Sequence, residues 1–137
     1  METLFAKQDR LLMLTSTEII RALMYKINWD AQLIAIRGPR GVGKTTLMLQ
    51  YIKQHYEAYN REVLYCTLDS VYFSNHTLLE FVDVFYKHGG KHLFLDEVHK
   101  YPTWSKEIKE IYDMYPDLRV VFSASSILNI LNAYADL

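Results

Sequence analysis

The chain has 137 residues, a formal net charge of −1 and a single cysteine. This length fits one domain, and a composition that is 50% hydrophobic and 23% charged allows a packed core. One cysteine excludes an internal disulfide framework, and the near-neutral charge argues against a dedicated nucleic-acid binder. No apolar run approaches the roughly 18 residues that span a bilayer, and the N-terminus lacks the apolar core of a signal peptide. We expect a cytoplasmic protein with no membrane contact.

Helices and strands are expected to alternate along the chain. Two N-terminal helices are predicted over residues 4–14 and 19–27, the second preceded by a capping box from Thr15 to Glu18. Short apolar runs then predict strands over 31–37, 62–68, 91–96 and 118–123, and periodic segments predict helices over 44–59, 77–88, 103–115 and 127–134. This alternation is typical of βαβ units and predicts an α/β fold with a mostly parallel sheet.

A glycine-rich loop follows the first expected strand. Residues 38–45 read G-P-R-G-V-G-K-T and match the phosphate-binding pattern G-x-x-x-x-G-K-[ST]. Such a loop wraps backbone N–H groups around an anion, and the helix after it presents its positive N-terminus. Lys44 would contact the β- and γ-phosphates, and the Thr45 hydroxyl would be a ligand for Mg²⁺. The alternative is a glycine turn that caps a helix. The residues expected to bind the nucleotide are Gly38, Pro39, Arg40, Gly41, Val42, Gly43, Lys44, Thr45 and Thr46.

An acidic pair ends the third expected strand. Asp96 and Glu97 follow the apolar run Leu93-Phe94-Leu95, and Asp96 lies 52 residues after Lys44. We expect Asp96 to hold Mg²⁺ and Glu97 to orient or deprotonate an attacking water. The alternative is an acidic strand end that caps the next loop. A water-activating carboxylate favours hydrolysis over transfer to a small molecule.

Polar residues also end the other expected strands. Ser123 or Ser125 could face the γ-phosphate, with a simple helix cap as the alternative for Ser125. Thr67 and Asp69 could hold Glu97, position water or merely begin a turn, and the turn is favoured. Residues 96–99 form a D-E-x-H box, as in one helicase superfamily, but the chain is too short for two motor domains, so the histidine is expected to be an ordinary loop residue.

Three segments together resemble a known family: I-A-I-R-G-P-R-G-V-G-K-T-T-L at 34–47, L-D-E-V-H-K-Y-P-T-W at 95–104 and F-S-A-S-S at 122–126. They are similar to the bacterial and archaeal AAA-superfamily ATPases that usually carry a C-terminal domain of unknown function. The resemblance covers residues 19–137. It implies a three-layer P-loop sheet of order 5-1-4-3-2, with ATP or ADP and Mg²⁺ as ligands. It also implies functional roles for Lys44, Thr45, Asp96 and Glu97, with Ser123 as a sensor of the γ-phosphate.

Two departures from the family pattern affect the expected activity. Ala124 stands where the family often has glycine, and the fifth strand, lid and C-terminal arginines of the family are not recognisable in this chain. We expect one domain over 1–137, with N-terminal helices at 1–28 and a nucleotide-binding core at 31–137, forming the N-terminal part of a longer protein. A short natural protein is the alternative.

The expected function is Mg²⁺-dependent ATP binding and hydrolysis, as the switch or motor half of a larger protein. Hydrolysis by the isolated chain should be slow, because no arginine finger is evident. The first strand should have an unpaired edge, so self-association or a missing C-terminal half is expected as partner. The alternatives are a nucleotide-binding interaction module without turnover and a small-molecule kinase.

Overall fold

The structure is a computed structural model that describes residues 1–38 and 43–125. The expected loop residues Pro39, Arg40, Gly41 and Val42 lie outside the described residues, as does the helix expected over 127–134. Within the described part, no helix is both long and apolar enough to cross a membrane.

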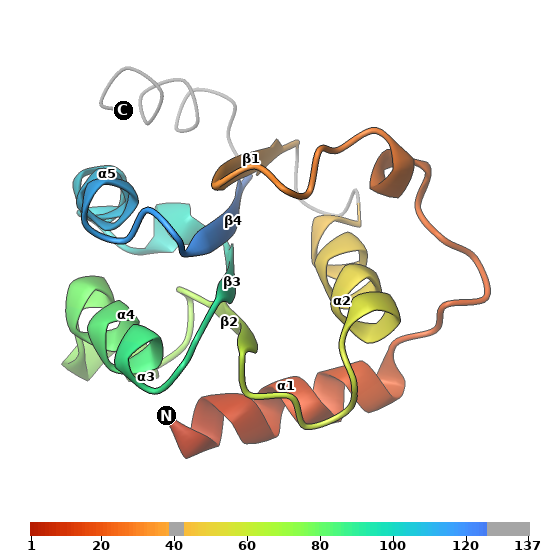
Figure 1. The fold of residues 1–137 in the computed structure, drawn as a ribbon, viewed down its shortest axis with the longest axis horizontal. Helices are drawn as coiled ribbons and strands as arrows, with labels where there is room; N and C mark the ends of the chain where they lie inside the picture. The colour runs from red at the N-terminus through yellow and green to blue at the C-terminus, as the bar shows by residue number, and fades with distance from the viewer. Residues whose placement is uncertain (39–42, 126–137) are drawn as a thin grey trace.

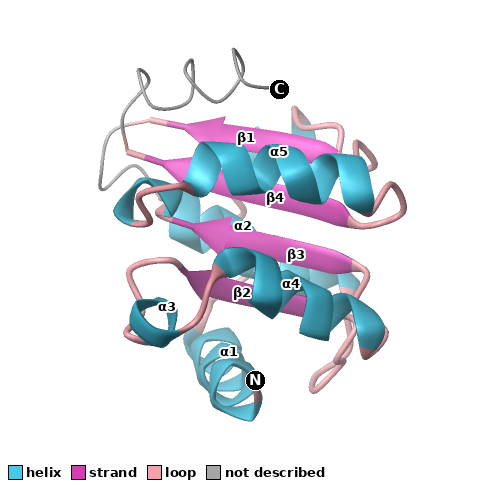
Figure 2. Cartoon of the chain, turned by 90° about the vertical axis from the view of Figure 1, so that its left-hand side faces the viewer, coloured by secondary structure: helices cyan, strands magenta, loops and turns pink. Residues whose placement is uncertain are grey.

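A parallel sheet of four strands forms the centre of the molecule (Figures 1 and 2). Its strands are β1 (Leu33–Arg37), β2 (Val63–Thr67), β3 (His92–Asp96) and β4 (Arg119–Ala124), in the order β1-β4-β3-β2. All three neighbouring pairs are parallel. The α/β fold and the predicted order 1-4-3-2 are therefore confirmed. None of the described residues forms a fifth strand.

Helices cover both faces of this sheet. The helix α2 (Lys44–His55) packs on one face, while α4 (Leu78–Lys87) and α5 (Trp104–Met114) pack on the other (Figure 1). Side chains alternate between the faces along each strand. One core therefore joins α4 and α5 to the sheet through Leu64, Leu93, Leu95, Val120 and Phe122. The other joins α2 to the sheet through Val63, Tyr65, Phe94 and Val121.

The N-terminal helix α1 (Glu2–Leu14) crosses the outer edge of β2 (Figures 1 and 2). Gln8 on this helix is 1% exposed. Its side-chain amide donates to the Val63 carbonyl at 3.2 Å and accepts from the Tyr65 N–H at 2.7 Å. A neighbouring parallel strand would make the same pair of bonds, so Gln8 satisfies this part of the sheet edge in place of a strand.

The second N-terminal helix, expected over 19–27, is not formed. Only the short 3-10 helix η1 (Ala22–Tyr25) is present there. The proposed capping box is wrong as well, because Thr15 follows the last turn of α1 and its hydroxyl donates to the Leu11 carbonyl at 2.7 Å. A short helix α3 (Tyr72–Asn75) and a 3-10 helix η2 (Val98–Lys100) were not predicted.

A tertiary contact explains why residues 16–21 are not helical. Gln50 on α2 is buried, and its amide donates to the carbonyls of Ser16 and Ile19 at 3.1 and 2.7 Å. It also accepts from the Arg21 N–H at 3.2 Å. These backbone groups would be bonded within a helix. Because Gln50 satisfies them instead, the tertiary contact outweighs the apolar periodicity of the segment.

Candidate nucleotide-binding site

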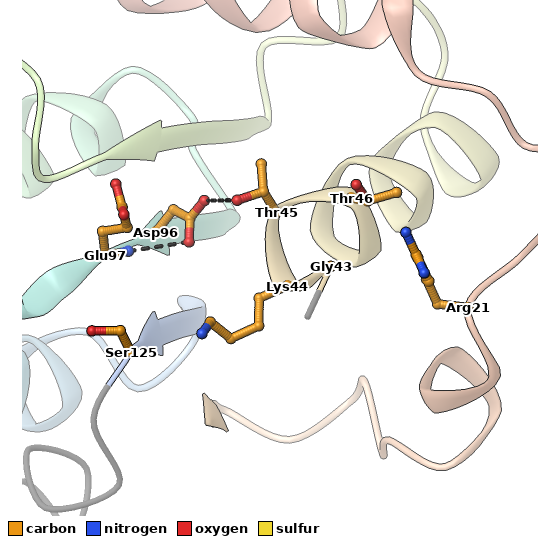
Figure 3. Close-up of a pocket in the computed structure, with 8 residues that line it drawn as sticks. All are labelled: Arg21, Gly43, Lys44, Thr45, Thr46, Asp96, Glu97 and Ser125. Atoms are coloured by element: carbon orange, nitrogen blue, oxygen red, sulfur yellow. Dashed lines mark hydrogen bonds between the residues drawn. The ribbon is translucent and has the colours of Figure 1, made fainter. Parts of the chain in front are cut away.

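The residues of the loop and of the acidic pair meet at one cavity. This cavity has a volume of about 340 Å³ and lies where α2 begins and where β3 and β4 end (Figure 3). Carboxyl ends of parallel strands are the usual ligand site of such folds. The cavity is lined by Arg21, Gly43, Lys44, Thr45, Thr46, Asp96, Glu97 and Ser125.

The start of α2 forms one wall of the cavity. Gly43 has φ +85°, a left-handed conformation that favours glycine, and a Cβ on it would lie 3.0 Å from the Arg21 guanidinium carbon. Lys44 donates from Nζ to the Gly38 carbonyl at the start of the loop. Burial lowers the pKa of Lys44, and the nearby charges of Asp96 and Glu97 oppose this shift. The helix N-terminus and Lys44 therefore give this wall the donors and positive charge that bind phosphates.

Asp96 is buried opposite this wall and accepts four hydrogen bonds. The hydroxyls of Thr45 and Tyr65 donate to Oδ2 at 2.5 and 2.6 Å. The Ser123 hydroxyl donates to Oδ1, and the Glu97 N–H donates to the same oxygen at 3.1 Å. Donors on both oxygens hold the carboxylate in one orientation. The predicted meeting of the loop with the acidic pair is therefore present as a direct contact between Thr45 and Asp96.

Tyr65 is a site residue that the sequence analysis missed. It lies on β2, opposite Phe94, and was treated only as part of an apolar strand. Burial and the neighbouring Asp96 raise its pKa, so the hydroxyl remains protonated and can donate. Nothing in its local pattern distinguishes it from a core tyrosine.

Glu97 adopts a backbone conformation that is uncommon for a residue with a side chain. Its φ and ψ are 51° and 48°, in the left-handed region. The Thr67 hydroxyl donates to its carboxylate at 3.3 Å and also accepts from the Asp69 N–H at 3.2 Å. Two of the expected roles of Thr67 are therefore present, since it contacts Glu97 and also stabilises a turn. Strained residues of this kind are frequent at functional sites.

Ser123 does not line the cavity, contrary to the expectation that it faces the γ-phosphate. It is fully buried, donates to Asp96 and accepts from the Glu97 N–H at 3.1 Å. The reason is that β4 extends to Ala124, one residue beyond the expected end, so Ser123 lies within the sheet.

The serine that reaches the cavity is Ser125. Its N–H donates to His99 Nδ1 at 3.3 Å, and its hydroxyl lies 3.1 Å from His99 Nε2. Burial lowers the pKa of His99. The histidine was expected to be an ordinary loop residue, but it belongs to η2 and contacts the end of β4 beside the cavity.

A second cavity of about 230 Å³ adjoins the first and shares Arg21, Gly43 and Lys44 with it. Arg21 was not anticipated, because it belongs to the segment expected to be helical. The remaining lining is largely apolar and consists of Ala22, Leu23, Ile36, Arg37 and Leu47.

Comparisons with known proteins agree with this architecture. Residues 30–137 match the family model described as an AAA domain. Among solved structures, the chain is similar to that of C. elegans PCH-2, with a TM-score of 0.52 and 17% identity, which indicates a shared fold. The similarity covers 98% of this chain but only 39% of the PCH-2 chain. No match is found among curated proteins. Since the family model spans most of the sequence, the chain belongs to the AAA superfamily of P-loop ATPases.

Proposed function

We propose that the chain binds ATP or ADP together with Mg²⁺ in the cavity at the start of α2, and that it hydrolyses ATP. The main support is the 2.5 Å contact between the Thr45 hydroxyl and Asp96. It joins the end of the phosphate loop to the end of β3, with Lys44 and Glu97 lining the same cavity.

Thr45 and Asp96 suit a magnesium ion. Both offer hard oxygen atoms, which Mg²⁺ prefers. Because the Thr45 hydroxyl uses its proton in the bond to Asp96, its oxygen lone pairs remain for a cation. These two residues would hold Mg²⁺, which when bound would neutralise negative charge on the phosphates.

The other lining residues would bind phosphate and direct water. Lys44 and the N–H groups of the first turn of α2 would bind the phosphate oxygens. The Glu97 carboxylate would orient a water molecule and accept its proton, and Thr67 would hold that carboxylate through its 3.3 Å bond. Ser123 would act as a positioning residue, because it bonds to both Asp96 and Glu97.

The second cavity suits the base of the nucleotide. Its apolar residues Ala22, Leu23, Ile36 and Leu47 could contact a flat ring, next to the shared residue Lys44. The sequence has no N-K-x-D motif for reading guanine, so adenine is favoured. We propose further that the ATPase cycle acts as the switch or motor of a larger assembly, and that the chain alone turns over slowly.

Calorimetric titration with Mg·ATP tests this function. Lys44→Ala should weaken binding about tenfold to a hundredfold, because it removes a charge-assisted contact worth about 1.5–3 kcal/mol. Lys53→Ala is a matched control on the same helix, since Lys53 is exposed and does not line the cavity, and its one hydrogen bond to a described residue is to the Thr15 carbonyl at 2.7 Å. Equal affinities of the wild type and Lys44→Ala would contradict the assignment. Phosphate release would separate a hydrolase from a silent binder, and a screen of small-molecule acceptors would reveal a kinase.

A further inference from the structure

Asp96 has a hydrogen-bond partner that belongs to neither sequence motif. The Tyr65 hydroxyl donates to Oδ2 at 2.6 Å, the same oxygen to which Thr45 donates at 2.5 Å. Tyr65 is 6% exposed and comes from β2, the neighbour of β3 in the sheet. The oxygen Oδ2, to which the proposed metal ligand Thr45 donates, is therefore held by two hydroxyl groups.

Tyr65 is itself held by the N-terminal helix. Its N–H donates to the Gln8 amide at 2.7 Å, and the same amide donates to the Val63 carbonyl at 3.2 Å. Gln8 lies outside residues 30–137, the part of the chain that matches the AAA domain. A continuous path thus leads from α1 through Gln8 and Tyr65 to Asp96 and Thr45.

We propose that Tyr65 is a positioning residue that fixes Asp96 for magnesium binding, and that Gln8 on α1 holds Tyr65 in place. This inference rests on the proposed function. Together with the donors on Oδ1, the two donors on Oδ2 hold the carboxylate in one orientation before the ion arrives. Without the Tyr65 hydroxyl, the one donor left on Oδ2 among the described residues is Thr45, the residue that would itself bind the ion.

The Mg²⁺ concentration required for nucleotide binding is the property to measure. ATP binding is titrated against Mg²⁺ and also measured in EDTA, for the wild type and for Tyr65→Phe. The variant should need about tenfold more Mg²⁺ for half-maximal binding, in the range found when partners of metal ligands are removed. Its affinity for metal-free ATP should equal that of the wild type. A purely structural role would instead lower both affinities.

Tyr51→Phe is the matched control, since Tyr51 is also 6% exposed and belongs to the same core as Tyr65. It should leave the Mg²⁺ dependence unchanged. Gln8→Leu tests the path from α1 and should shift the dependence in the same direction as Tyr65→Phe, by a smaller factor. Gln8 forms no hydrogen bond with the described residues that line the cavity, so this variant also serves if Tyr65→Phe does not fold.

Two failures can be distinguished. If the wild type binds no nucleotide, or binds it without regard to Mg²⁺, the proposed function is overturned and this inference with it. If the wild type depends on Mg²⁺ and Tyr65→Phe has the same dependence, the inference alone is overturned. An equal shift in Tyr51→Phe would also overturn it, because the effect would then come from the core in general.

Discussion

The strand β3 carries a buried titratable side chain at each end. His92 begins the strand and Asp96 ends it, about 13 Å away at ~3.3 Å per residue. Both lie on the face that packs against α2, with Phe94 between them. Asp96 accepts four hydrogen bonds. His92 contacts the Tyr56 hydroxyl through Nδ1 at 2.8 Å, and within the described part of the chain its Nε2 has no partner.

Asp96, whose hydrogen bonds are satisfied, therefore belongs to a candidate ligand site, whereas His92, whose hydrogen bonds are incomplete among the described residues, lowers the stability of the fold. At the carboxyl end, side chains from two other strands and a helix, together with the Glu97 N–H, donate to one carboxylate beside a cavity. At the amino end, Arg119 donates to the Tyr56 hydroxyl at 3.2 Å, and this hydroxyl lies 2.8 Å from His92 Nδ1. Burial, together with the charges of Arg119 and His55, lowers the pKa of His92 to about 3. A buried polar group with too few partners reduces stability without serving a ligand.

The largest expected effect is on catalysis at the carboxyl end. Glu97→Gln removes the proposed base but leaves the metal ligands, so phosphate release should fall by about 10²–10⁴. The affinity for Mg·ATP should be unchanged. Single-turnover phosphate release and calorimetry on the same sample would measure both. Wild-type turnover in this variant would show that Glu97 has no role in the chemistry.

Asp96→Asn should affect metal dependence rather than the water. An amide cannot accept four hydrogen bonds and carries no charge, so the Mg²⁺-dependent part of ATP affinity should fall about tenfold to a hundredfold. Binding of ATP in EDTA should be preserved. Calorimetric titrations with and without Mg²⁺ would measure this change. If this variant and Glu97→Gln behaved alike in binding and turnover, the proposed division of roles would be wrong.

His92, at the amino end of β3, should make the free energy of unfolding depend on pH. His92 is neutral in the folded state, whereas in the unfolded chain it binds a proton below its ordinary pKa of 6.5. Its contribution is therefore present above pH 6.5 and is lost as the pH falls toward 3. The free energy of unfolding should drop by about 1.4 kcal/mol per pH unit in this window. Urea unfolding between pH 7.5 and 5.5 measures the slope, which His92→Phe should reduce relative to the wild type. Equal slopes would mean that His92 is not buried in its neutral form.

The smallest effect is expected from Tyr56, which among the described residues is the hydrogen-bond partner of the His92 ring. Tyr56→Phe removes the bond to Nδ1 and should lower the free energy of unfolding by about 1 kcal/mol. Tyr86→Phe is the exposed counterpart, because the Tyr86 hydroxyl donates to Asp117 at the surface at 2.8 Å. It should change stability by less than Tyr56→Phe does. If thermal melts showed a larger loss of stability for Tyr86→Phe than for Tyr56→Phe, the bond between Tyr56 and His92 would not be the more stabilising of the two.

The sequence predicted the strands well because buried parallel strands are continuous apolar runs. All four begin and end within about two residues of the expected bounds. The phosphate loop and acidic pair were recognisable since their spacing is local and chemically specific. Together they identified Lys44, Thr45, Asp96 and Glu97, which all line one cavity.

The errors have a common cause, which is contact between residues far apart in the chain. The helix expected over 19–27 does not form because Gln50, about 30 residues later in the chain, bonds to the backbone of this segment. Tyr65 and Gln8 were missed because their partners lie 31 and 57 residues away. Ser123 was misplaced since one additional residue in a strand decides whether a side chain is inside the sheet or at its edge.

The contact of α1 with β2 also has a consequence for synthesis on the ribosome. Gln8 emerges 55 residues before its partner Val63. At about 5–20 residues per second, α1 must therefore wait roughly 3–11 s before that strand exists. During this interval its apolar residues Leu4 and Phe5, which are buried in the folded protein, have no strand to cover. Once β2 is made, its outer edge can be protected at once by a helix that is already present. The order of synthesis thus leaves the helix exposed for seconds but gives the strand little time to pair with another nascent chain.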